Sequence, residues 1–399
     1  MSRKVVLVTG VFPPGIGGMQ NYYYNLSKHT KHHMTVLAPD YPGSDSFDKG
    51  QPFRIIRGPF MRGERADVTS WGRLLRYVQR MHRNEDPDIT VYGYILIGFI
   101  GLLLRVFSGR RYVISTHGMD MLMFRKYFGL NQIIKLILRR ADGVLTNSEY
   151  TKRLVEQYGV DPSRIGLVNP GVEAIFNREV KNAELLRQHG LEGKYVLLTV
   201  GRLVTRKGHD RVIESMPAIM QRIPNAVYVI VGDGPERGRL EQLAKKIGVS
   251  EAVRFVGSVD GSERLNDYYN LADQFIMVCR ELEEGDVEGF GIVYLEAASV
   301  GVPVIGGKSG GASEAVLDGE TGLLVAPESH AEITAAIVRL AGDTVLRDRL
   351  VQEGYTRAKT QFQHENLAEA FDQYIGWLCG RPARGKKRAE GPAIGRLRS

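Results

Sequence analysis

The first 170 residues alternate short apolar runs with segments of helical periodicity. Apolar runs that predict β-strands lie at 4–10, 34–39, 53–58, 88–94, 110–118 and 142–148. Helices are predicted over 18–29 and 71–83, and the run at 88–94 leads into a third helix at 95–107. This alternation predicts a parallel sheet with helices on both faces. In such sheets, ligands bind where the strands end.

A second alternating series begins at residue 194, after a pause at 164–172 and a polar stretch at 173–193. Its predicted strands are 194–202, 226–234, 253–257, 274–280, 303–311 and 322–327, and its predicted helices are 208–222, 236–247, 291–300, 332–340, 346–361 and 365–378. The pattern predicts an α/β protein of two doubly wound domains, at 1–170 and 171–364. The C-terminal helix, 365–379, could cross back to the first domain, and the basic tail at 380–399 is expected to be disordered.

Composition agrees with ordinary globular domains and excludes other classes. The 399 residues are 43% hydrophobic and 25% charged, which excludes wholesale disorder and fibrous repeats. Two cysteines, Cys279 and Cys379, are too few for a disulfide scaffold, so we expect a reducing cytosol. The N-terminal segment lacks the apolar core of a signal peptide and is interpreted as the mature start. The uncharged run at 89–104 is shorter than the ~20 residues of a membrane span, and we expect none.

Charge is distributed unevenly along the chain. The net charge is +8, but residues 1–170 carry 24 Lys and Arg against 13 Asp and Glu, whereas residues 171–379 carry 22 against 31. The last twenty residues carry 7 against 1. A basic half and an acidic half suggest that the two domains bind different partners.

The predicted helix at 71–83 concentrates positive charge on one side. Four arginines at spacings of three, four and three share one face of this helix, while apolar residues lie opposite. A solvated helix face is one interpretation. Because basic segments are attracted to anionic lipid, we favour a lipid acceptor or an anionic membrane surface. The residues assigned to the acceptor or membrane are Asn21, Arg73, Arg76, Arg80 and Arg83.

Two segments of the N-terminal half carry candidate binding residues. A glycine-rich loop at 9–18, containing Gly17 and Gly18, follows the first strand and opens a helix, which suits an anion. The loop is too long, and too rich in proline, for a dinucleotide fingerprint, which disfavours nicotinamide chemistry. His117 directly follows an apolar strand, where ligands bind, although it could simply cap a helix.

The C-terminal half places charged residues on two predicted loops. Arg202 and Lys207 lie on a loop that feeds a helix and suit a pyrophosphate, whereas Arg206 is expected to face solvent. Glu288 and Glu296 lie eight residues apart across a glycine-rich loop and a helix start. A glycosidase pair lies ~5–9.5 Å apart, whereas eight helical residues span ~12 Å. We therefore expect the two glutamates to contact different parts of one long ligand.

These motifs together resemble the family 4 retaining glycosyltransferases of GT-B fold. The resemblance covers residues 4–378 and is most specific over 288–325. Within the family, the segments GGMQ, THGMD and DVEGFGIVYLEA look most like the bacterial phosphatidylinositol mannosyltransferase group. The resemblance implies two Rossmann-like domains that face each other across a deep cleft.

The resemblance also implies a role for each matching residue. Arg202 and Lys207 would hold the donor diphosphate, Glu296 the ribose and Glu288 the donor sugar. His117 would contact the sugar near the reacting carbon. The residues implied in catalysis are His117, Arg202, Lys207 and Glu288. The remaining donor contacts would come from Gly17, Gly18, Val256, Gly257, Phe290, Gly291, Ile292 and Glu296.

The implied activity is metal-independent transfer of a hexose, with mannose favoured, from a nucleotide-diphosphate sugar. GDP-mannose is the favoured donor and a UDP-sugar the alternative; no cofactor is expected. The acceptor would be lipid-linked, or a polyol or glycan, and the protein cytoplasmic or peripheral on the inner face of the membrane. Asp86 and Asp88 match a metal-binding Asp-x-Asp by letters only and are interpreted as a turn.

Two other readings of the sequence stay open beside this one. A nucleotide-sugar epimerase and a transferase for a soluble acceptor are the alternatives. Nucleic acid is not an expected partner, because much of the net charge lies in the tail and no aromatic-rich basic motif is present. The oligomeric state is left open.

Overall fold

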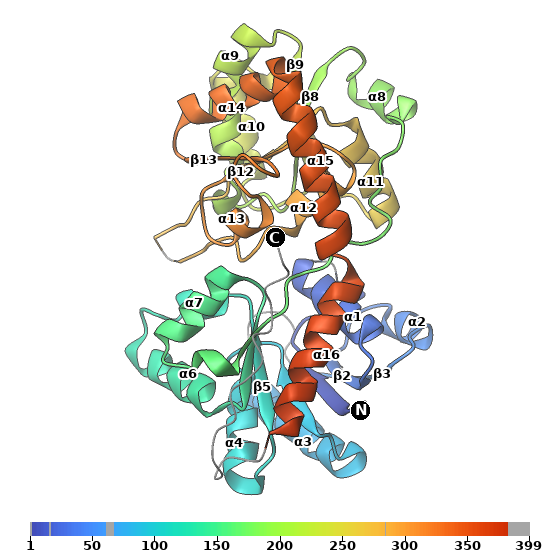
Figure 1. The fold of residues 1–399 in the computed structure, drawn as a ribbon, viewed down its shortest axis with the longest axis vertical. Coiled ribbons are helices and arrows are strands. Elements are labelled where there is room, and N and C mark those ends of the chain that lie inside the picture. The colour runs from blue at the N-terminus through green and yellow to red at the C-terminus, as the bar shows by residue number, and fades with distance from the viewer. Residues whose placement is uncertain (1, 16, 61–67, 284, 382–399) are drawn as a thin grey trace. The chain divides into compact units, whose positions relative to one another are not determined.

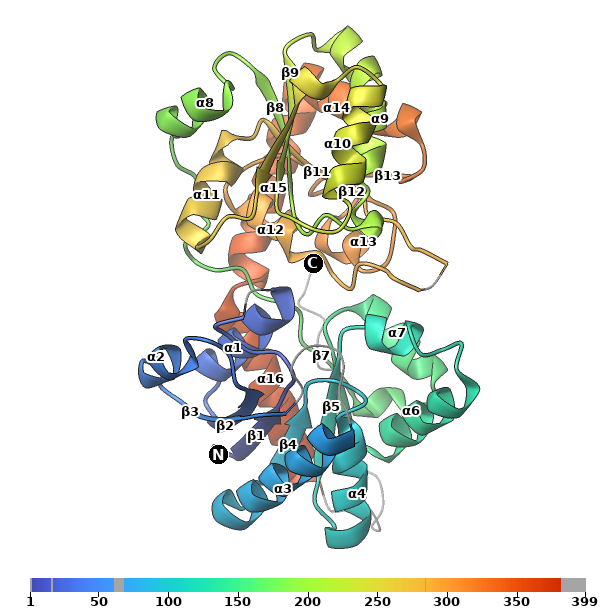
Figure 2. The ribbon, with the colours of Figure 1, turned by 180° about the vertical axis from the view of Figure 1, so that it is seen from behind.

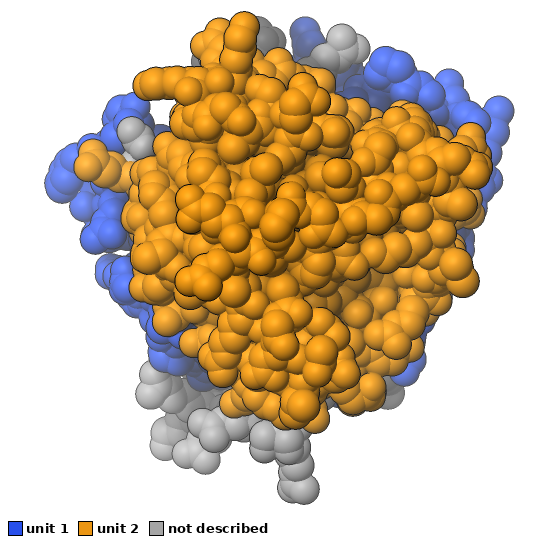
Figure 3. Space-filling view, turned by 90° about the horizontal axis from the view of Figure 1, so that it is seen from above, with its two compact units in different colours: residues 1–171, 364–399 blue, residues 172–363 orange. Residues whose placement is uncertain are grey.

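The computed structural model describes residues 2–15, 17–60, 68–283 and 285–381 (Figure 1). The chain forms two compact units, coloured separately in Figure 3. Unit 1 comprises Met1–Gly171 and His364–Ser399, and unit 2 comprises Val172–Gln363. The predicted tail begins at residue 380, but Gly380 is the last residue of a helix, and residues 382–399 lie outside the described residues.

Unit 1 contains a seven-stranded parallel sheet in the order β3-β2-β1-β4-β5-β6-β7. The strands are β1 (Lys4–Val8), β2 (His33–Pro39), β3 (Arg54–Gly58), β4 (Ile89–Tyr92), β5 (Tyr112–Thr116), β6 (Gly143–Thr146) and β7 (Ile165–Leu167). Every residue of β4, β5 and β6 is buried, as expected for strands covered on both faces. The order reverses direction beside β1, which makes this edge a switch point for ligand binding.

Helices cover both faces of this sheet. Against one face pack α1 (Gly18–His29) and α16 (His364–Gly380). Against the other pack α3 (Val68–Glu85), α4 (Gly98–Ser108), α6 (Phe128–Arg140) and α7 (Glu149–Gln157). The short helices are α2 (Ser44–Lys49) and α5 (Met119–Leu122). Because each helix follows a parallel strand, α3, α4 and α6 all run from the carboxyl edge of the sheet.

The C-terminal helix α16 belongs to unit 1 although it follows unit 2 in sequence. The hydroxyl of Tyr374 donates to the carbonyl of Arg164 at 2.6 Å, and Asp372 accepts a hydrogen bond from the backbone N–H of Lys31. Its buried apolar residues, among them Phe371, join the core beneath α1.

Unit 2 is also built on a parallel sheet with helices, here six-stranded in the order β10-β9-β8-β11-β12-β13. The strands are β8 (Tyr195–Val200), β9 (Ala226–Val231), β10 (Val253–Gly257), β11 (Gln274–Met277), β12 (Val304–Gly307) and β13 (Leu323–Val325). The helices are α8 (Ala183–His189), α9 (His209–Arg222), α10 (Arg237–Lys246), α11 (Ser262–Leu271), α12 (Ile292–Ser299), α13 (Ala312–Ala315), α14 (His330–Gly342) and α15 (Thr344–Gln361).

The architecture confirms the predicted fold class of two doubly wound α/β domains. The uncharged run at 89–104 forms β4 and most of α4, so it is a buried strand and a packed helix as predicted. Helices α6, α7, α8 and α11 were not predicted. Among the described residues, no helix combines the length and apolar character that crossing a bilayer requires.

Candidate active site

Lys207 and Glu288 form an ion pair at the carboxyl edge of the unit 2 sheet. Lys207 lies in a 3-10 turn (Thr205–Lys207) between β8 and α9, and Glu288 lies between β11 and α12. Nζ of Lys207 is 2.6 Å from Oε2 of Glu288, and both side chains are largely buried. Burial alone would raise the pKa of Glu288, but the charges of Lys207 and Arg206 outweigh it and lower that pKa to about 2. Glu288 is therefore ionised at neutral pH.

Gly208 allows this loop to pass directly into α9. Its φ of 72° lies in the left-handed region, and a Cβ there would come 2.2 Å from the carbonyl oxygen of Val278. Glycine at this position thus permits Lys207 to lie beside Glu288.

Arg206 does not face solvent, so that expectation is wrong. Its Nε lies 2.9 Å from Oδ1 of Asp286, and its Nη1 lies 3.8 Å from Oε2 of Glu288. The tight turn at Thr205–Lys207 directs the side chains of Arg206 and Lys207 toward the same carboxylate, and this direction could not be derived from spacing. Both cations therefore balance Glu288.

Arg202 contrasts with Lys207. Its side chain is exposed, and no hydrogen bond or ion pair of its guanidinium occurs among the described parts of the chain. Five donors in a planar group are therefore free to bind a diphosphate.

Glu296 lies on α12 beside a buried tyrosine. Its Oε2 accepts a hydrogen bond from the hydroxyl of Tyr269 at 2.6 Å. Burial raises the pKa of Glu296 to about 7, although the Tyr269 bond acts in the opposite direction. Near neutral pH this carboxyl group is therefore partly protonated.

The start of α12 offers backbone N–H groups rather than side chains. Gly291 is the N-cap, with φ 89°, and a Cβ there would lie 2.6 Å from the ring of Tyr294. The Phe290 ring is buried against Phe362, at 5.7 Å between centroids. Gly291 and Ile292 can therefore present the unpaired N–H groups of a helix start to an anion, while the Phe290 ring cannot reach one.

The predicted donor contacts Val256 and Gly257 lie on β10, which β9 separates from β8 and its donor loop. Val256 and Gly257 end β10, and the carbonyl of Gly257 accepts from the N–H of Gly232 at 2.8 Å. They share the carboxyl edge with Lys207 because β10 is parallel to β9 and β8.

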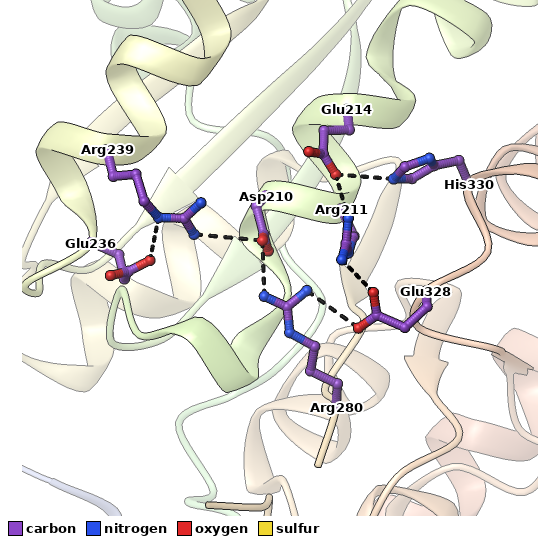
Figure 4. Close-up of polar contacts among 8 residues, drawn as sticks. All are labelled: Asp210, Arg211, Glu214, Glu236, Arg239, Arg280, Glu328 and His330. Carbon is purple, nitrogen blue, oxygen red and sulfur yellow. Dashed lines mark hydrogen bonds and ion pairs between the residues drawn. The ribbon is translucent and has the colours of Figure 1, made fainter. Parts of the chain in front are cut away.

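An ion-pair network that was not predicted supports the same edge (Figure 4). Arg280 donates to Asp210 at 2.8 Å, and both side chains are nine-tenths buried. The backbone N–H of Arg280 also donates to the carbonyl of Arg206 at 2.9 Å. The other members are Arg211, Glu214, Glu236, Arg239, Glu328 and His330. A charged residue at the end of the apolar run 274–280, three residues beyond β11, was the available signal for Arg280.

In unit 1, His117 lies directly after β5 among tyrosines. Its Nε2 is 2.9 Å from the hydroxyl of Tyr23, which lies 2.8 Å from the carbonyl oxygen of Gly93. Because that carbonyl can only accept, we assign the Tyr23 proton to it and the Nε2 proton to His117. Burial lowers the pKa of His117 to about 4, so the imidazole is neutral at pH 7. Its Nδ1 is then an acceptor. The run of tyrosines at 22–24 was the signal for these partners.

The glycine loop leads into the neighbouring helix. Gly17 is the N-cap of α1, no side chain caps this helix, and Asn21 is exposed on its first turn. Since β1 and β5 are parallel members of one sheet, Gly17, Gly18 and His117 lie at the same edge of unit 1.

The predicted arginine helix is α3. Its four arginines are all exposed, while Leu74, Val78 and Met81 are buried against the sheet. The exposed set comprises Arg73, Arg76, Arg80 and Arg83.

The described residues contain no group of three His, Cys, Asp or Glu side chains that could hold a metal. Asp86 pairs with Arg110, and Asp88 accepts from the backbone N–H of Lys4 at 2.8 Å. Both aspartates precede β4, so they lie at the edge of the sheet opposite His117.

Comparisons with known proteins identify glycosyltransferases as relatives of this chain. Residues 181–357 match the model described as glycosyl transferases group 1, and residues 16–174 match that described as Glycosyltransferase Family 4. A GDP-mannose-dependent alpha-(1-6)-phosphatidylinositol monomannoside mannosyltransferase of Mycobacterium tuberculosis is 35% identical over 373 residues, which cover 89% of this chain and 92% of that protein. A second relative, from Corynebacterium glutamicum, is described as a GDP-mannose-dependent monoacylated alpha-(1-6)-phosphatidylinositol monomannoside mannosyltransferase. It is 29% identical over 378 residues, which cover 92% of this chain and 96% of that protein.

Solved structures share the architecture. Sucrose-phosphate synthase from Thermosynechococcus elongatus superposes with a TM-score of 0.78 at 23% identity, covering 94% of this chain and 99% of that one. Anabaena HepE, solved with UDP-glucose, has the same TM-score and coverage at 19% identity. These likenesses establish the fold.

Proposed function

The chain belongs to glycosyltransferase family 4, and from this premise we propose that it is a retaining mannosyltransferase that uses GDP-mannose and a phosphatidylinositol-type lipid acceptor. The observation that carries the proposal is the 35% identity, over nearly the whole of both chains, to a mannosyltransferase described as GDP-mannose-dependent.

On the donor side, the geometry of unit 2 suits a sugar diphosphate. Arg202 has five free donors, and Lys207, five residues further along the same loop, adds a second positive charge. These cations would stabilise the negative charge that develops on the departing diphosphate. Glu288, held ionised by its neighbours, would accept hydrogen bonds from sugar hydroxyls. No metal or other cofactor is part of this proposal, because the two cations supply the positive charge.

Glu296 would bind the ribose of the nucleotide. A carboxylate oxygen that already accepts from Tyr269 has a second oxygen left to accept from a hydroxyl group. The N–H groups at Gly291 and Ile292 would face phosphate or sugar oxygens at the start of α12.

On the acceptor side, the neutral His117 would contact the donor sugar near the reacting carbon. Its tautomer is set by Tyr23, so Nδ1 is left as an acceptor for a sugar hydroxyl. Gly17 and Gly18 would let the backbone approach the diphosphate, and Asn21 would face the acceptor.

The exposed arginines of α3 would attract an anionic lipid surface. Each basic side chain near such a surface contributes ~1 kcal/mol. We therefore place the protein at the cytoplasmic face of the membrane, where a lipid acceptor and a water-soluble donor can meet.

The test is a product assay with a choice of donors and acceptors. The purified chain is incubated with GDP-mannose or UDP-glucose, each with a phosphatidylinositol mannoside, with free inositol or with no acceptor. We expect a mannosylated lipid from GDP-mannose alone, with retained anomeric configuration. Transfer to free inositol but not to lipid would favour the soluble-acceptor alternative. A sugar isomer formed without any acceptor would favour the epimerase.

A further inference from the structure

Arg206 gives Glu288 a second cation, to which the proposed reaction assigns no role. Nη1 of Arg206 lies 3.8 Å from Oε2 of Glu288, and Nζ of Lys207 lies 2.6 Å from the same oxygen. Nε of Arg206 lies 2.9 Å from Oδ1 of Asp286. One carboxylate oxygen therefore faces two cations, and only Lys207 is a proposed ligand of the diphosphate.

Both cations reach Glu288 from one short turn. They belong to the 3-10 turn Thr205–Lys207 after β8, and Glu288 follows β11, which is the neighbour of β8 in the sheet that Figure 2 shows from behind. The backbone carbonyl of Arg206 accepts from the N–H of Arg280 at 2.9 Å, which ties this turn to the segment after β11. The Arg206 side chain is only 19% exposed, so it is held at the carboxylate rather than in solvent.

The guanidinium of Arg206 has a donor to spare. Nη1 is buried, and it has no hydrogen-bond acceptor among the residues that the structure describes. At 3.8 Å, Oε2 of Glu288 is too far away for a hydrogen bond but close enough for an ion pair. Because an unsatisfied buried donor is costly, a closer approach of this carboxylate to Nη1 would be favourable.

A bound sugar diphosphate would change the charge around Glu288. Under the proposed function Lys207 stabilises the diphosphate, so its charge is then shared between two anions. The diphosphate also brings negative charge close to Glu288, and like charge disfavours an ionised carboxylate. The other titratable groups near Glu288 in the described part of the chain are Asp286, Cys279 and Tyr294, and none of them supplies positive charge.

We propose that Arg206 is a positioning residue that keeps Glu288 ionised while Lys207 binds the donor diphosphate. Nη1 of Arg206 then donates to Oε2, and the carboxylate stays able to accept hydrogen bonds from sugar hydroxyls. Arg206 acts through Glu288 and has no donor contact of its own. The inference rests on the proposed function for the role of Lys207, but the relation between Arg206 and Glu288 can be tested without a donor.

The first test removes Lys207 from the donor-free protein. Lys207→Met and the double variant Lys207→Met/Arg206→Gln are compared by urea denaturation between pH 4.5 and 8. With Arg206 present, the pKa of Glu288 should stay below its ordinary value of 4.5, so Glu288 adds no pH dependence as the pH rises. Without either cation, burial raises that pKa, and stability is lost as the pH rises from 4.5 through the folded pKa.

The ratio of the two unfolding equilibrium constants, double variant over single variant, should therefore grow at least tenfold across this range. A ratio that does not depend on pH would overturn the proposal.

The second test uses the single variant Arg206→Gln in mannosyl transfer from GDP-mannose at a saturating concentration of phosphatidylinositol mannoside. The pH dependence of kcat reports groups in the donor-bound enzyme, and that of kcat/KM reports groups in the free enzyme. We expect the acidic limb of kcat to move upward by at least one pH unit. The limb of kcat/KM should move much less, because Lys207 still faces Glu288 in the free enzyme.

Arg206→Lys keeps a cation at this position and should restore the wild-type profile of kcat. Equal movement of the two limbs in Arg206→Gln, or movement of neither, contradicts the proposal.

Arg211→Gln is the matched control for the loss of a partly buried arginine. The Arg211 side chain is 27% exposed and pairs with Glu214 and Glu328 in the same unit, so neither pH profile should move. A shift equal to that of Arg206→Gln would reveal a general effect of lost charge and would also overturn the proposal.

The two tests separate this proposal from the proposed function. If the unfolding ratio grows with pH but no mannosyl transfer is detected, the proposed function fails while the role of Arg206 at Glu288 stands. If transfer is detected but the unfolding ratio does not depend on pH, the proposed function stands and the role of Arg206 is wrong.

Discussion

Nζ of Lys207 lies 2.6 Å from Oε2 of Glu288, so the side chains proposed to hold the donor diphosphate and the donor sugar are joined to each other. The ion pair holds both in place across a sequence separation of 81 residues. A donor that reaches both therefore meets a fixed pair rather than two mobile chains, which lowers the entropic cost of orienting it.

Replacing each of the two donor-loop cations by alanine should affect turnover and the unfolding free energy differently. Lys207→Ala and Arg202→Ala should each lower kcat/KM at least tenfold. Each variant lacks a positive charge that would stabilise the negative charge on the departing diphosphate. Only Lys207→Ala should also lower the unfolding free energy, since it leaves Glu288 without its closest cation. Arg202 is exposed, so its removal should change stability by less than ~0.5 kcal/mol. Steady-state kinetics and urea denaturation measure the two effects. Near-normal turnover in both variants would contradict the assignment.

Glu296 should make stability fall as pH rises. Its pKa is raised from 4.5 to about 7, so the unfolded chain ionises before the folded one. The resulting loss of unfolding free energy is absent below pH 4.5 and grows as the pH rises to 7. It reaches about 3 kcal/mol at most. Glu296→Gln cannot ionise but can still accept from Tyr269. Its stability relative to wild type should therefore increase between pH 4.5 and 7, as followed by urea denaturation. A difference independent of pH would argue against the raised pKa.

Turnover should not depend on a divalent metal. In the proposed mechanism, Arg202 and Lys207 would supply the positive charge for which other transferases use a metal ion. Activity is compared in buffer and in excess EDTA, and little change is expected. Complete loss in EDTA, with recovery on adding magnesium or manganese, would refute this role for the two cations.

The network in Figure 4 should support the donor loop through Arg280. Burial alone would raise the pKa of Asp210, but its hydrogen bond and proximity to Arg280 lower it. Arg280→Met should therefore cost ~3–5 kcal/mol, as expected when one partner of a buried ion pair is lost. Arg239→Gln is the matched control, because that side chain is half exposed and should cost less than ~1 kcal/mol. Equal costs in thermal unfolding would show that the buried pair has no special role.

Much of the fold was accessible from the sequence, because strand and helix periods are local properties. The first helix was predicted with the bounds that α1 has, since Gly17 and Gly18 precede a continuous helical pattern. Helix α6 was missed because Phe128, Ile133 and Leu136 are exposed and obscure its polar face. Helix α11 contains few aliphatic residues, so its period is weak.

The site was predicted as a set of loops but not as a set of contacts. Strand ends indicate which loops share an edge, and this position singled out His117. Lys207 was proposed as a cation on a loop that feeds a helix, and Glu288 from its spacing to Glu296. Pairing between Lys207 and Glu288 depends on two loops far apart in sequence. The direction of Arg206 depends on one 3-10 turn, and neither feature leaves a periodic signal.

The arginines of α3 should supply the salt-sensitive part of membrane binding. All four are exposed on a helix whose other face is buried, so changing them to Gln removes positive charge without disturbing packing. Their attraction to anionic lipid is screened with a Debye length of ~8 Å at physiological ionic strength. The quadruple variant, with residues 382–399 also removed, should sediment less with anionic vesicles at low salt and resemble wild type at high salt. GDP-mannose binding should hardly change, because none of the four arginines is among the proposed donor contacts. The variant carries Arg73→Gln, Arg76→Gln, Arg80→Gln and Arg83→Gln. If it sediments at low salt as much as the wild-type protein does, a soluble acceptor is favoured.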